Sequence, residues 1–268
     1  MGWRDQIAKA MTGIKAYHSS PHDFDRFDLS KIGTGEGAQV YGHGLYFAEN
    51  PKVSGQGGQY WDQFVSRFGG PESTAAKELQ FHGFDRDKAA ESMRSRIMYP
   101  DEALPADVIK RQLDLRREAL RLLESGKPVG PRTYEVNINA DPAHMLDWDR
   151  ALDAQNPQVT GGLTSVFDKR YGKGFTSDYI RQGTDFRDIY NNFDDFDPAQ
   201  MSAMLNEAGI PGVKYLDGAA RAAGTGSSNY VVFDPSIIDI TKKYAVPGAV
   251  GAGAIGSLAA QDQYEVAQ

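Results

Sequence analysis

The hydrophobic pattern along the chain changes its period several times, and each period predicts a different element. Residues 132–138 (RTYEVNI) alternate polar and apolar side chains, which is the period of a half-buried strand. Residues 229–234 (NYVVFD) carry the strongest strand signal, and shorter strands are expected at 16–18, 45–48 and 210–216.

Helical periods occupy two other regions. Residues 52–126 are expected to be mostly helical, and within them residues 107–124 place leucines among arginines and glutamates, as in an amphipathic helix with a solvated basic face. A shorter helix is expected at 202–208, ending at Gly209. Strands and helices do not alternate regularly, so we predict an α+β fold rather than a doubly wound parallel sheet.

The charge balance argues against one broad class of function. The chain of 268 residues contains 29 Lys and Arg against 36 Asp and Glu, a formal charge of −7. A generic nucleic-acid binder needs a basic face, because much of its affinity comes from counterion release. A nucleic-acid partner is therefore not expected, although a local basic patch is compatible with this balance.

Two residue types limit the catalytic chemistry. The chain has no cysteine, which excludes disulfides, thiol nucleophiles and thiolate metal sites. Its five histidines are scattered, and none belongs to a His-Glu-x-x-His pattern. We therefore expect neither a zinc hydrolase nor any other requirement for a metal.

The two ends of the chain differ from the middle. Residues 1–14 are expected to form a short amphipathic helix, without the apolar core of a signal peptide. Residues 245–268 are expected to form a Gly/Ala-rich flexible tail, whose uncharged part is shorter than a membrane span of about 20 residues. Stable membrane insertion is not expected, and the tail is also compatible with the start of a segment from a longer parent chain.

Two segments near the N-terminus carry the strongest candidate chemistry. Residues 17–21 read Tyr-His-Ser-Ser-Pro, and residues 42–48 read Gly-His-Gly-Leu-Tyr-Phe-Ala. An imidazole and a phenol on neighbouring strands suit a flat cationic ring joined to a ribose, as at the nicotinamide end of NAD+. Taken alone, His18 has a plain structural interpretation as a satisfied buried histidine, and Tyr46 has one as a core residue.

Together with the late strand Asn-Tyr-Val-Val-Phe-Asp, these segments resemble ADP-ribosyltransferases of the His-Tyr-Glu type, the branch of diphtheria-type toxins and poly(ADP-ribose) polymerases. The chain is most similar to the ADP-ribosyltransferase-like domains of large phage polyvalent proteins. The resemblance implies a split antiparallel β-sheet core across residues 15–244, interrupted by a helical insertion at about 71–126.

The resemblance also implies roles for individual residues. His18 would hydrogen-bond the ribose on the nicotinamide side, with Ser19 or Ser20 beside it. Tyr46 would stack on the nicotinamide ring, and Tyr41 would form a second wall. Arg221, in the loop before the last strand, would contact the pyrophosphate or the acceptor. NAD+ would be the substrate.

The chain departs from the family at one position. The family glutamate, which normally precedes the aromatic residue of the last strand, is replaced by Asn229. An amide can bind a ribose hydroxyl but cannot offset a developing positive charge. Either another acid serves, or the enzyme works without that acid, or the domain binds NAD+ without cleaving it. We favour the first explanation, with Glu36 ahead of Glu49, whose alternative role is to cap the following helical turn.

The expected activity is that of an NAD+-dependent mono-ADP-ribosyltransferase, a phage or bacterial effector. It would cleave the bond between nicotinamide and ribose and transfer ADP-ribose to a host macromolecule, with protein as the expected acceptor. The expected location is the cytoplasm of a bacterial host. Association with a virion before delivery into the host is also compatible with the sequence. An NAD+ glycohydrolase of the same fold, and an inactive NAD+-binding module in a virion or polyvalent assembly, stay open as alternatives.

Overall fold

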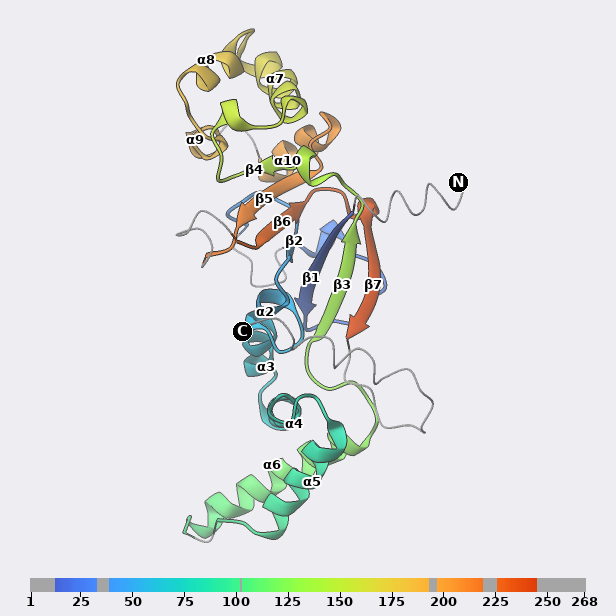
Figure 1. The fold of residues 1–268 in the computed structure, drawn as a ribbon. Helices are drawn as coiled ribbons and strands as arrows, with labels where there is room; N and C mark the ends of the chain where they lie inside the picture. The colour runs from blue at the N-terminus through green and yellow to red at the C-terminus, as the bar shows by residue number, and fades with distance from the viewer. Residues whose placement is uncertain (1–12, 33–38, 102, 193–196, 219–225, 245–268) are drawn as a thin grey trace, which may run out of the picture. The chain divides into compact units, whose positions relative to one another are not determined.

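The computed structural model describes residues 13–32, 39–101, 103–192, 197–218 and 226–244 (Figure 1). These residues fall into two compact units, one formed by the chain before residue 68 and after residue 130, the other by residues 68–130. No helix in the described part of the chain combines the length and the apolar character that a membrane crossing needs.

The first unit is built on one seven-stranded sheet, in the order β4-β5-β6-β2-β1-β3-β7. Its pairs are antiparallel except for β4 with β5, so the predicted α+β class is confirmed. The strands are β1 (Ile14–Ser20), β2 (Leu45–Ala48), β3 (Arg132–Ile138), β4 (Leu146–Asp147), β5 (Gly212–Leu216), β6 (Ser228–Val232) and β7 (Ile238–Tyr244).

The sheet is nearly divided between β2 and β1. β1 pairs with β3 along its whole length, and β2 pairs with β6 along its whole length. Between β1 and β2, by contrast, the only paired positions in the described chain are Tyr17 and Ala48. We call this place, where β1 and β2 separate, the junction. Figure 1 shows β1, β3 and β7 side by side, and these three strands form one half of the sheet.

Each face of the sheet buries its own core. On one face, which we call the loop face, Phe47, Tyr134 and Val232 pack with Phe27 from the segment that follows β1. On the other, the helix face, Val231 and Phe233 pack with residues of a group of helices. These helices are α7 (Pro157–Tyr171), α8 (Phe175–Arg181), α9 (Phe186–Asn192) and α10 (Pro198–Glu207).

Short helical segments complete the first unit. They are α2 (Pro51–Ser54) and α3 (Gln59–Phe68), with the 3-10 turns η1 (Leu29–Lys31), η2 (Pro142–His144), η3 (Leu152–Ala154) and η4 (Pro235–Ile237). Of the helix expected at 1–14, residues 1–12 lie outside the described chain, and Ile14 already belongs to β1. The tail expected at 245–268 lies outside it as well.

The second unit contains α4 (Gly70–Phe81), α5 (Arg86–Met98) and α6 (Ala106–Glu124). α6 confirms the amphipathic helix predicted at 107–124. The buried Arg86 guanidinium donates hydrogen bonds to the carbonyl oxygens of Leu122, Leu123 and Lys127. It thereby satisfies carbonyl groups in the last turn of α6 and just beyond it, which have no partner within the helix. The insertion expected at about 71–126 falls within this unit.

Candidate functional site

His18 occupies the junction at which the two halves of the sheet separate. Its Nδ1 lies 2.9 Å from the carbonyl oxygen of Tyr46 on β2. A carbonyl oxygen only accepts, so Nδ1 carries the hydrogen, and in the neutral ring Nε2 is left as an acceptor. Nε2 has no hydrogen-bond partner among the residues that the structure describes, and the side chain is partly exposed. The geometry therefore leaves an oriented lone pair for a ligand that donates a hydrogen bond.

Aromatic rings surround this imidazole on the loop face. The centroid of the His18 ring lies 5.2 Å from that of Phe27, 5.7 Å from that of Phe47 and 6.4 Å from that of Tyr134. Burial among these rings lowers the pKa of His18 below its ordinary value, more than the bond to Tyr46 raises it. The ring is therefore held in the neutral form near pH 7, the form in which Nε2 accepts.

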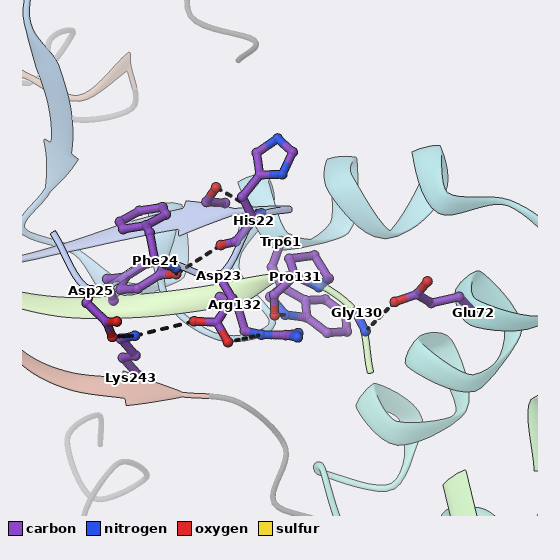
Figure 2. Close-up of polar contacts among 12 residues, drawn as sticks. His22, Asp23, Phe24, Asp25, Trp61, Glu72, Gly130, Pro131, Arg132 and Lys243 are labelled. Atoms are coloured by element: carbon purple, nitrogen blue, oxygen red, sulfur yellow. Dashed lines mark hydrogen bonds and ion pairs between the residues drawn. The ribbon is translucent and has the colours of Figure 1, made fainter. Parts of the chain in front are cut away.

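The segment that follows β1 is tied to β3 and β7 by the contacts in Figure 2. Lys243 Nζ lies 2.6 Å from the carboxylate of Asp25 and 3.3 Å from that of Asp23, and the Asp23 carboxylate also lies 3.7 Å from Arg132 Nε. The Tyr134 hydroxyl donates to the His22 carbonyl oxygen. These contacts position the aromatic residues of the segment over the His18 ring.

Tyr46 lies on the helix face. Its hydroxyl donates to the carbonyl oxygen of Gly42 at 2.9 Å and accepts from the backbone N–H of Tyr41 at 3.2 Å. Its ring lies 6.5 Å from that of Tyr215, on which Tyr41 stacks at 3.8 Å. Burial raises the pKa of Tyr46, so the phenol stays protonated at neutral pH. The predicted pair of Tyr46 and Tyr41 is thus brought together.

Gly44, in the segment before β2, occupies a position that has no room for a side chain. A Cβ atom at this position would lie 2.6 Å from Val231 Cγ1 and 2.7 Å from the Val232 carbonyl oxygen. Only glycine lets this backbone lie directly against β6.

The predicted clamp of His18 and Tyr46 around one pyridine ring is wrong. Tyr46 and Phe47 are consecutive residues of a strand, so their side chains point to opposite faces. The His18 ring contacts Phe47 on the loop face, whereas the Tyr46 ring packs with Tyr215 on the helix face. The sequence brings the two residues to adjacent strands, but the strand register places their rings apart.

Asn229 shares the face of Tyr46. It is paired with Ala48 on one side and with Tyr215 on the other. Its Oδ1 is buried and has no hydrogen-bond partner among the described residues. A buried acceptor without a donor costs free energy unless a ligand or water supplies one. A hydroxyl or amino group brought to this end of β6 would satisfy this oxygen.

The other predicted residues have varied positions. Ser19 donates from Oγ to the carbonyl oxygen of Ser54 at 2.8 Å, and Ser20 Oγ accepts from the backbone N–H of His22. Ser19 therefore ties β1 to α2, and Ser20 holds the turn that follows β1. Glu36 and Arg221 lie outside the described residues.

No family model, curated protein or solved structure matches the chain. The chemistry of the site is therefore argued from its own residues. Across the described ranges, no group of three or more His, Asp or Glu side chains is arranged to hold a metal ion.

Three tyrosines near Tyr46 were not predicted as site residues from the sequence. The ring of Tyr215 stacks on that of Tyr41. Tyr190 and Tyr60 lie close enough to act on the ionisation of Tyr46. Their wide separation along the chain hides this grouping from any local pattern.

Stability should fall in mild acid because of His18. In the folded chain burial holds its pKa below the ordinary value of about 6.5, which the unfolded chain retains. Below about pH 6.5 the unfolded state therefore binds the proton first, and the free energy of unfolding decreases as the pH falls, by up to about 1.4 kcal/mol per pH unit. Urea unfolding between pH 7.5 and 5 should show this slope, and a His18→Asn variant should show a shallower one. Equal slopes would contradict the assignment.

Proposed function

We propose that the chain is an NAD+-dependent mono-ADP-ribosyltransferase of the His-Tyr-Glu type, acting as a phage or bacterial effector on a host macromolecule. One observation carries the proposal. The three segments that bear the resemblance, distant in sequence, form three consecutive strands, β6, β2 and β1. A common ligand site is the simplest reason for three such segments to meet at a junction where the sheet divides.

The polar atoms at this junction fit the ribose of NAD+. His18 Nε2 and Asn229 Oδ1 are both acceptors without a partner among the described residues, and ribose hydroxyls are donors. His18 lies level with Phe47 on β2, which ends at Ala48, and β6 begins at Ser228. His18 would meet the ligand from the loop face, and Asn229 and Tyr46 would meet it from the helix face.

The chemistry follows from these groups. Cleavage of the bond between nicotinamide and ribose passes through a transition state that resembles an oxocarbenium ion. Hydrogen bonds that orient the ribose hydroxyls lower the barrier only if they hold the sugar in its reacting conformation. A fixed His18 tautomer and a buried Asn229 oxygen are suited to this, because neither has to reorganise during the reaction.

Labelled NAD+ tests this function directly. The purified protein should transfer label from the adenine side of NAD+ to macromolecules of a bacterial lysate, mainly proteins, and should release free nicotinamide. Heat-denatured protein serves as the control. Release of nicotinamide with no macromolecular label would identify an NAD+ glycohydrolase instead. Neither label nor nicotinamide would contradict both activities.

Asn229 favours one alternative from another class. Because an amide replaces a carboxylate at this position, the domain could bind NAD+ without cleaving it and act as a module of a virion or polyvalent assembly. Calorimetry separates the two functions. Saturable heat of NAD+ binding without nicotinamide release supports the module, and release supports the enzyme.

A further inference from the structure

A shallow hollow of about 280 Å³ lies on the first unit. Its lining comes from the connection between β3 and β4, from the end of α10, and from the residues just before β5 and β7. The lining residues are Asn139–Asp141, His144, Asn206, Gly209, Pro211 and Ile237. None of the residues assigned to NAD+ at the junction is among them, so the hollow is a separate feature of the surface.

The charge of the hollow is negative. Asp141 Oδ1 accepts from the backbone N–H of Ala143 at 2.9 Å and so caps η2, while Oδ2 has no partner among the described residues. A second carboxylate, that of Asp239, accepts from Asn139 Nδ2 at 2.7 Å. Within the described chain neither aspartate forms an ion pair, and the lining contains no lysine or arginine.

The end of α10 adds to this negative potential. Asn206 belongs to the last turn of this ten-residue helix, and Gly209 follows its C-cap. The aligned peptide dipoles of a helix leave a partial negative charge at its C-terminus, which favours a cation nearby. The hollow therefore favours a positively charged group.

Two neutral polar side chains define what kind of cation fits. The ring nitrogens of His144 and the amide of Asn206 have no hydrogen-bond partner in the described ranges, and both residues are half-buried. A neutral imidazole and an amide each offer an acceptor, so with Asp141 the hollow presents acceptors from three side chains. A guanidinium carries five N–H donors in a planar fork and is more weakly hydrated than an ammonium, so it suits several separate acceptors beside water.

The open shape of the hollow indicates the source of this cation. A site for a free small molecule encloses most of its ligand, which a shallow hollow does not do. An arginine within a protein chain brings further contacts from its neighbours, and Pro211 and Ile237 offer apolar surface for its aliphatic stem. We propose that this hollow binds an arginine side chain of a partner protein. The proposal goes beyond the proposed function and holds whether or not the chain cleaves NAD+.

The test is an NMR titration of the isotope-labelled protein with a short glycine–serine peptide that contains one central arginine. The backbone amide signals of Ala143 and Gly209 should shift and saturate. Asp141→Asn should weaken binding about fivefold, the effect of losing one exposed charge pair. The asparagine oxygen can still accept from the Ala143 N–H, so the fold should persist.

Two controls separate recognition from general charge. Asp101→Asn is the matched variant, because the exposed Asp101 accepts from the Ala103 N–H in the same way but lies in the second unit, and it should bind like the wild type. A peptide with citrulline, a neutral isostere of arginine, should not shift the two signals. Unshifted signals with the arginine peptide, equal binding by Asp141→Asn, or equal binding of the citrulline peptide would each overturn the proposal.

Discussion

Replacing His18 by asparagine is expected to lower nicotinamide release from NAD+ by about 100-fold or more, whereas glutamine should preserve part of the rate. The asparagine amide nitrogen takes roughly the place of Nδ1 and can still donate to the Tyr46 carbonyl oxygen, but nothing replaces Nε2. The glutamine amide reaches the position of Nε2 and can accept from the ribose. The two variants therefore separate the loss of the hydrogen bond to Tyr46 from the loss of the hydrogen bond to the ribose.

Their stabilities provide the control. Both variants lose contacts with the aromatic rings around His18, so both should unfold at a lower temperature than the wild type. Activity is therefore compared well below the lower unfolding midpoint. If asparagine keeps the rate and glutamine loses it, the imidazole acts only through Tyr46, and its assignment to the ribose is wrong.

Tyr46→Ala is expected to reduce kcat/KM for NAD+ by about 100-fold or more, since it removes the ring that would support the ligand on the helix face. Tyr46→Phe keeps the ring and loses only the hydroxyl, leaving the Tyr41 N–H and the Gly42 carbonyl oxygen without that partner. It should lower the free energy of unfolding by about 1–3 kcal/mol and retain most of the activity.

Urea unfolding and NAD+ kinetics on both variants check this prediction. Tyr99→Phe, at a tyrosine that is 75% exposed, provides a comparison with little packing to lose. Full activity of Tyr46→Ala in a folded protein would remove Tyr46 from the site. Equal losses of activity in Tyr46→Phe and Tyr46→Ala would indicate that activity depends on the hydroxyl, which holds Tyr41 and Gly42 in place.

The elements that sequence reasoning predicted are those with a local signal. The alternation at 132–138 corresponds to β3, and the leucine period at 107–124 corresponds to α6. α7 had no such signal, because Gly161 and Gly162 interrupt it and are poor helix formers. A Cβ at Gly162 would lie 2.9 Å from the Ala208 carbonyl oxygen, so this glycine serves close packing that only the tertiary structure reveals.

The candidate site shows the same division between local and non-local information. The motifs identified the strands that carry His18, Tyr46 and Asn229, and these strands are adjacent in the sheet. The face of each side chain depends on the register between β1 and β2, which pair at a single position, and no local pattern encodes it. Glu49, predicted as an alternative acid or as a helix cap, does not cap α2, because the N-cap of that helix is Asn50.

The most direct test of the account is the amount of nicotinamide that the purified wild-type protein releases from NAD+, measured beside His18→Asn under identical conditions. The account predicts release over many turnovers by the wild type and a loss of about 100-fold in the variant. No release by a folded wild type, or equal release by both proteins, would contradict a ribose-binding site at the junction of β1, β2 and β6.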